Sequence, residues 1–148
     1  MNKIILSGRL ARDPDIKRSN NQNGVCVNAR FTIACSRGRR NGQDLGTDFV
    51  SCIAFGSVAE VLEKYFMKGS RINLCGHIQT GKYQDRNGQT IYTTDVYAEN
   101  IEFVDTKTER QQLTGDLPPQ EVYNQAAAGQ DCQKAYYDSR GTSSYNYN

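Results

Sequence analysis

The sequence predicts an all-β fold: a small barrel of five strands with one helix between the third and fourth, followed by a disordered C-terminal tail. Two observations carry this prediction. Segments in which apolar and polar residues alternate recur over residues 1–105, and only the segment after Phe55 changes to the period of about 3.6 that is typical of a helix. Over residues 106–148, Gln, Asn, Gly, Ser and Tyr predominate without periodicity, and such a segment cannot bury enough apolar surface to offset its ordering entropy.

The first two long strands are expected on either side of a polar, turn-rich segment. Alternation runs over residues 3–10, where Gly8 indicates a bulge or a sharp bend. A brief edge strand is expected at residues 16–18. The clearest alternation in the chain covers residues 25–36, with one face made of Val25, Val27, Ala29, Phe31, Ile33 and Cys35. That face is expected in the core and the other in solvent.

The third strand and the helix follow each other directly. The strand, residues 48–55, places Phe49, Ser51, Ile53 and Phe55 on one face and Val50, Cys52 and Ala54 on the other. The helix carries an apolar stripe of Val58, Val61, Leu62, Tyr65 and Phe66. A capping box of Ser57 and Glu60 is expected at its start, and Gly69 is expected as its left-handed stop. Before this strand, residues 37–47 hold three arginines and three glycines and are expected to form a mobile cationic loop.

The last two strands are expected to form a long hairpin. Residues 71–83 and 91–103 both alternate, and Asp85-Arg86-Asn87-Gly88 between them is a turn signal, so residues 83–92 should project from the body. Five strands with one helix between the third and fourth is the element order of an OB barrel, a Greek-key barrel that binds oligonucleotides or oligosaccharides on one face.

Composition narrows the class of function. The net charge is only +2, but residues 1–43 hold nine Lys or Arg against two Asp, which indicates a polyanion partner. The five cysteines lack a C-x-x-C pair and His77 is the single histidine, so no metal and no cofactor are expected, and the strand cysteines are expected to act as small buried hydrophobes. No pairing of nucleophile and base indicates an enzyme. No apolar run approaches the roughly 20 residues of a membrane span, so a cytoplasmic protein without a membrane partner is expected.

Short motifs in a specific order give the chain a resemblance to a known family. It resembles bacterial-type single-stranded DNA-binding proteins of the cellular, phage or mobile-element kind over roughly residues 1–105. Each motif is weak alone, but their order and spacing together are specific. The motifs are Gly8-Arg9-Leu10, Asp13-Pro14, Phe31-Thr32-Ile33-Ala34, Asp48-Phe49, Phe55-Gly56, Ala59-Glu60, Tyr65, Lys68-Gly69-Ser70, Gly76-His77-Ile78-Gln79-Thr80, Lys82-Tyr83 and Tyr92-Thr93-Thr94-Asp95-Val96.

The resemblance implies an OB-fold domain over residues 1–105 that assembles as a homotetramer and wraps single-stranded DNA in replication, recombination and repair, without catalysis. It implies that Phe49, Phe55 and Tyr83 stack on bases. Strand parity alone suits Phe49 and Phe55 to the core as well as to the surface, and the resemblance favours the surface. Phosphate contacts are expected from Lys3, Arg9, Arg30, Arg37, Arg39, Arg40, Lys68, Arg71, Lys82 and Arg86. A cytoplasmic, nucleoid-associated location follows from this function.

Departures from the family pattern leave alternatives open. Many relatives carry tryptophan where this chain has Phe49 and Tyr83, and Arg39 or Arg40 stands near a loop position that is often aromatic. The end of the sequence, residues 143–148, lacks the acidic tip through which cellular relatives recruit replication and repair proteins, so that docking is not carried over. An OB-fold interaction module and an RNA-binding module remain alternatives, because stacking platforms accept either sugar.

Overall fold

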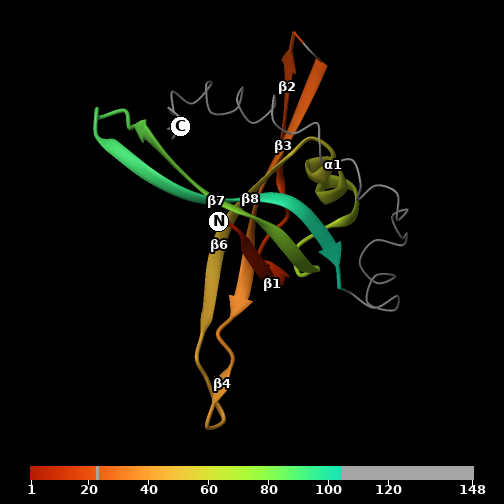
Figure 1. Cartoon of the computed structure of the whole chain (residues 1–148), viewed down its shortest axis with the longest axis vertical. Helices are drawn as coiled ribbons and strands as arrows, with labels where there is room; N and C mark the ends of the chain where they lie inside the picture. Colours follow the sequence, from red (N-terminus) through yellow and green to blue (C-terminus); the bar gives the residue numbers. More distant parts are fainter. Residues whose placement is uncertain (23, 105–148) are drawn as a thin grey trace.

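The computed structural model describes residues 1–22 and 24–104, and the predicted tail lies outside these residues (Figure 1). The elements in chain order are β1 (Ile4–Leu10), β2 (Asp15–Asn21), β3 (Gly24–Ser36), β4 (Arg39–Arg40), β5 (Gln43–Asp44), β6 (Thr47–Phe55), α1 (Gly56–Tyr65), β7 (Arg71–Gln84) and β8 (Thr90–Phe103). Strands β1, β3, β6, β7 and β8, with α1 as the single helix of the described residues, confirm the predicted OB-type order. The edge strand expected at residues 16–18 is longer than predicted and pairs along its whole length with β3.

Closure of the sheet makes the barrel. Six strands follow the order β1-β7-β8-β6-β3-β2, and β1 pairs with β7 through most of its length and with β3 at its end. Gly8 lies at this change of partner, where an added Cβ would stand 2.4 Å from the Ala34 carbonyl oxygen. The glycine therefore permits the close approach that a bent, doubly paired strand requires. On the other side, β6 and β8 run parallel and pair only through Cys52 with Val96 and Ile53 with Tyr97.

The core fills the barrel with most of the side chains that alternation predicts. Val25 is the exception on β3: alternation predicts it in the core, but it is 63% exposed, because it lies where β3 pairs only with β2 and projects beyond β6. Its largest fully buried side chains include Phe31, Ile33, Leu62, Ile72 and Leu74. The helix packs Ala59, Val61 and Leu62 against this core. Beyond the helix, the ring of Phe66 stacks on Phe103 with centroids 4.0 Å apart. Cys52 is buried as a small hydrophobe, and burial raises the pKa of its thiol to about 12.

Both expected helix signals are displaced. The helix begins at Gly56 with Phe55 as its N-cap, so Ser57 is not the capping residue. Gly56 has a φ of +57°, and this left-handed conformation turns the strand into the helix within one residue. At the other end, the helix stops at Tyr65 with Phe66 in an extended conformation. Gly69 is left-handed, with a φ of +91°, but it belongs to the turn into β7, where its N–H donates to the Leu10 carbonyl oxygen at 2.8 Å.

Three hairpins project from the barrel in different directions (Figure 1). They are β2–β3, the short β4–β5 hairpin, and the distal part of β7–β8. The last of these, residues 79–95, is named the arm. Within the described part of the chain, its two strands pair only with each other, because the pairing of β6 with β8 ends at Val96. The hairpin expected at residues 83–92 is therefore confirmed and is longer than predicted.

Candidate nucleic-acid interface

The outer face of the sheet carries the aromatic residues that the sequence singles out. We use this name for the side chains of β3, β6, β7 and β8 that point away from the barrel interior. The ladders place Arg30 beside Ile53, Ile53 beside Tyr97 and Tyr97 beside His77 on this face. Phe49 lies at one end of it and is 68% exposed. A large ring held in solvent by a regular strand is what a base-stacking platform requires.

Phe55 contradicts the expectation of an exposed platform. It shares the outer face with Phe49, as predicted, but only 2% of it is exposed. Its ring stacks on that of Tyr97, with centroids 5.6 Å apart and planes 24° apart, and the two rings form a small second core with Ile53. Parity therefore assigns the two faces of β6 correctly but does not reveal that the outer face is itself covered at this end. The residue that covers Phe55, Tyr97, is not predicted from the sequence, because it lies on a strand that pairs with β6 at only two positions.

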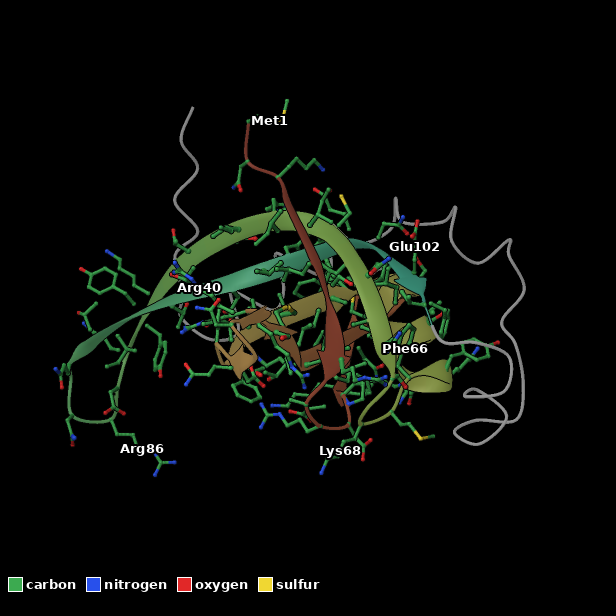
Figure 2. The ribbon with its side chains drawn as sticks, turned by 90° about the horizontal axis from the view of Figure 1, so that it is seen from below. Met1, Arg40, Phe66, Lys68, Arg86 and Glu102 are labelled. Atoms are coloured by element: carbon green, nitrogen blue, oxygen red, sulfur yellow. The ribbon has the colours of Figure 1, made fainter. Side chains whose placement is uncertain are left out.

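The arm presents the second predicted aromatic. Tyr83 lies on the same side as His77 along the regular ladder of β7 and β8, and it is 36% exposed. Lys82 is half-buried on the opposite side. The turn at the tip is closed by hydrogen bonds between Asp85 and Gln89 and between Gly88 and Asp85, each 2.8 Å. Arg86 is exposed at this tip, at the far end of the arm from the barrel (Figure 2).

The arginine-rich segment is a hairpin, so the prediction of a mobile loop is wrong. In the backbone ladder of β4 and β5, Arg39 lies opposite Asp44 and Arg40 lies opposite Gln43. Asn41 and Gly42 between them both have positive φ, 52° and 79°. Positive φ at both central residues is the geometry that an Asn-Gly turn favours. That dipeptide is the signal that could have predicted the hairpin. It holds Arg39 and Arg40 in solvent beyond the end of β6 that bears Phe49.

Arg37 and Arg30 each face a carboxylate. The Arg37 Nε lies 2.9 and 3.0 Å from the two carboxylate oxygens of Asp48, and this hydrogen bonding lowers the pKa of Asp48. Arg30 lies 3.6 Å from the buried Asp95, and its Nε is buried without a hydrogen-bond partner among the described residues. Neither cation is therefore available to an added anion unless it shares or exchanges its acidic partner.

Lys3, which lies just before β1, belongs to a cluster with side chains of β7 and β8. Its ammonium pairs with Glu99, and the Nδ1 of His77 lies 2.8 Å from the other carboxylate oxygen of Glu99. The imidazole also packs on the ring of Tyr97, with centroids 4.8 Å apart. Hydrogen bonds from Lys3 first and His77 second lower the pKa of Glu99.

Arg9, Lys68 and Arg71 form a separate group at the opposite end of β7 from the arm. Arg9 and Arg71 are direct partners across β1 and β7, and they line a shallow groove of about 450 Å³. Arg9 donates from Nη1 to the Gly69 carbonyl oxygen at 2.8 Å, while the backbone N–H of Lys68 donates to Asp13 at 2.7 Å. The predicted cations are thus divided among the arm, the β4–β5 hairpin, the outer face and this group.

Within residues 1–22 and 24–104, no three His, Cys, Asp or Glu side chains are grouped so that they could hold a metal ion. The helix in this part of the chain is too short and too polar to cross a membrane.

In the described residues, β1, β3, β6, β7 and β8 form the five barrel strands and β2 adds an edge strand, with exposed aromatic and cationic side chains on one face and on the projections. This architecture defines an OB-fold binding protein. A sequence model described as "Single-strand binding protein family" matches residues 1–104. The chain is 41% identical over 106 residues to a single-stranded DNA-binding protein of Clostridium perfringens, covering 72% of this chain and 67% of the relative. It is 40% identical over 108 residues to one of Oceanobacillus iheyensis, covering 72% and 65%. It is 36% identical over 141 residues to single-stranded DNA-binding protein 1 of Staphylococcus aureus, covering 95% and 85%.

The chain therefore belongs to the single-strand binding protein family. Membership agrees with the predicted resemblance and with the expectation of a binding protein rather than an enzyme.

Proposed function

We propose that this protein binds single-stranded DNA with little sequence preference and protects it during replication, recombination and repair. The observation that carries the proposal is the pair of exposed rings on the outer face, Phe49 at the end of β6 and Tyr83 on the arm. Arg39 and Arg40 extend beyond the first ring and Arg86 beyond the second. The names of the relatives, which are single-stranded DNA-binding proteins, support this ligand.

The chemistry of the ligand explains this arrangement. An unpaired strand exposes base faces and a chain of phosphates, whereas a duplex hides its base faces in the stack. Every base has a face that can stack, so rings at intervals bind without reading sequence, and cations on flexible projections contact the phosphates between them. No group has to react, and binding alone shields the strand.

Substitution of the two rings tests the proposal. Phe49→Ala and Tyr83→Ala should each weaken binding of a mixed-sequence single strand by about 1 to 3 kcal/mol, measured by fluorescence anisotropy. Val25→Ala is the matched control, because Val25 is 63% exposed on the distant β2–β3 hairpin. Equal affinity of the parent protein for duplex DNA would contradict the proposal. Preference for an RNA of the same sequence would favour the RNA-binding alternative.

Assembly as a homotetramer in the cytoplasm, associated with the nucleoid, is part of the same proposal. One OB fold covers roughly 4 to 16 nucleotides, so a single barrel offers a short track, and several barrels in one particle allow a long strand to wrap. Light scattering of the full chain at micromolar concentration should give the mass of four chains. A monomeric mass would contradict this part of the proposal and leave DNA binding by one barrel to be judged separately.

A further inference from the structure

Solvent reaches both faces of the arm, because Asp95 at its base is the only buried residue among residues 79–95. Its ladder matches Tyr83 with Ile91 and Lys82 with Tyr92, so the two tyrosines lie on opposite faces. Tyr83 belongs to the outer face. Tyr92 belongs to the other face, which we name the reverse face of the arm.

The ring of Tyr92 contributes little to the packing of the protein. It is 79% exposed, whereas Phe55 and Tyr97 bury most of their ring surface against each other. A cross-strand aromatic stabilises a hairpin when it packs on its neighbours, and this degree of exposure leaves most of the ring in water. Stability of the arm therefore does not account for a large ring at this position.

The surroundings of Tyr92 suit a polyanion. The reverse face of the arm is made of Thr80, Lys82, Gln84, Thr90, Tyr92 and Thr94. It carries one cation and no carboxylate, and Arg86 lies in the adjoining turn. On the outer face, by contrast, the arm begins at the acidic Asp95. An exposed ring among hydroxyl groups and cations is the composition of a base-stacking site.

We propose that the reverse face of the arm is a second stacking platform for single-stranded DNA, with Tyr92 as its base-binding ring. A DNA strand bound along the outer face contacts Tyr83, passes the tip of the arm near Arg86 and continues along Tyr92. The DNA then contacts both faces of the arm. This inference rests on the proposed function and adds a route and a residue to it. A short strand occupies the outer face, where Phe49 and Tyr83 lie, and only a longer strand also engages Tyr92.

The length of the bound DNA strand provides the test. Binding of homothymidine strands of roughly 8 and roughly 40 nucleotides, below and above the upper range of one OB fold, is measured for the parent, Tyr92→Ala and Tyr83→Ala. Tyr83→Ala should weaken binding of both lengths. Tyr92→Ala should leave the short strand unchanged, weaken the long one by roughly 5-fold or more, and shorten the length occupied per protein on long polythymidine.

Matched variants separate the ring from other effects. Tyr92→Phe keeps the ring and should bind like the parent, and Val25→Ala, which removes an exposed side chain from the β2–β3 hairpin, should also bind like the parent. Unchanged affinity of Tyr92→Ala for both lengths overturns the inference, and so does equal weakening for both. A changed mass in light scattering also overturns it, because a second copy of the chain would then cover this face. If the parent itself fails to bind either strand, the proposed function fails and this inference with it.

Discussion

Phe55 and Phe49 lie on the same face of one strand but in opposite environments. Phe55 stacks on Tyr97 and is almost fully buried, so truncation to alanine leaves a cavity. We expect Phe55→Ala to lower the free energy of unfolding by about 3 to 5 kcal/mol in urea titrations. Affinity for single-stranded DNA per folded molecule should stay near that of the parent.

The matched control is Phe49→Ala, six residues earlier on the same strand face. Its ring is exposed, so the same truncation should change stability little. A Phe55→Ala protein that melts like the parent but binds DNA weakly would show that the stacked pair opens to admit a base. The contrast between these two residues could not be predicted from parity, because parity records which way a side chain points and not what lies above it.

At the scale of elements, Glu99 on β8 joins His77 on β7 to Lys3, the residue before β1. Its carboxyl has a pKa below its ordinary value of 4.5, so the folded state binds fewer protons than the unfolded state. The cluster therefore contributes stability above about pH 4.5, and this contribution is lost as the pH falls through the lowered folded value. Glu99→Gln should reduce the drop in melting temperature between about pH 7 and about pH 3.

Two comparisons give this prediction its controls. Glu102→Gln removes an exposed carboxylate from the same strand and should retain the acid sensitivity of the parent. Some sensitivity should persist in Glu99→Gln, because Arg37 lowers the pKa of Asp48 as well. The same slope of melting temperature against pH in Glu99→Gln and the parent would show that the cluster does not contribute to stability.

The close approach of β7 to β8 depends on Gly76. A register shift lies between Cys75 and Gly76, and a Cβ on Gly76 would stand 1.9 Å from the Tyr97 carbonyl oxygen. Gly76→Ala should therefore destabilise the protein by about 1 to 3 kcal/mol, because backbone must move to make room. Gly81→Ala on the same strand is the control, since its Cβ would meet only the Thr93 hydroxyl at 3.2 Å. Equal melting temperatures for the two variants would contradict this account of Gly76.

Local patterns and long-range contacts differ in how well they can be predicted. Alternation and the single change of period predict the five long strands and the helix, because both are set by neighbouring residues. The Asn41-Gly42 turn also carries a local signal, although glycine and arginine content favoured a loop. The short parallel contact of β6 with β8 and the pairing of Lys3 with Glu99 join segments far apart in the chain, and no periodicity encodes them.

At the scale of the whole molecule, the cations are divided between projections and the barrel wall. Arg39, Arg40 and Arg86 are exposed on the β4–β5 hairpin and on the tip of the arm. Lys3, Arg30 and Arg37 lie closer to the barrel, and each of these three pairs with an acidic side chain. Net charge therefore says less about DNA binding than the position of each cation, because a paired cation gains less from a phosphate than one held in solvent.

This division gives a prediction for the salt dependence of binding. Each phosphate contact that a cation makes to a single strand adds about 0.7 to the slope of log affinity against log salt concentration. The double substitution Arg39→Gln and Arg40→Gln should therefore lower the magnitude of that slope by about 1.4 per chain engaged, with no change in melting temperature. Affinity is measured by fluorescence anisotropy across a series of sodium chloride concentrations.

The matched control removes two exposed cations elsewhere, Arg12→Gln and Lys17→Gln, which precede and lie on β2. This variant has the same net charge as the double hairpin variant, so a slope that falls equally in both would mean that only overall charge matters. A slope that falls only in the hairpin variant places Arg39 and Arg40 on the path of the DNA backbone. An unchanged slope in the hairpin variant would remove the β4–β5 hairpin from that path and leave the arm as the projection that contacts phosphates.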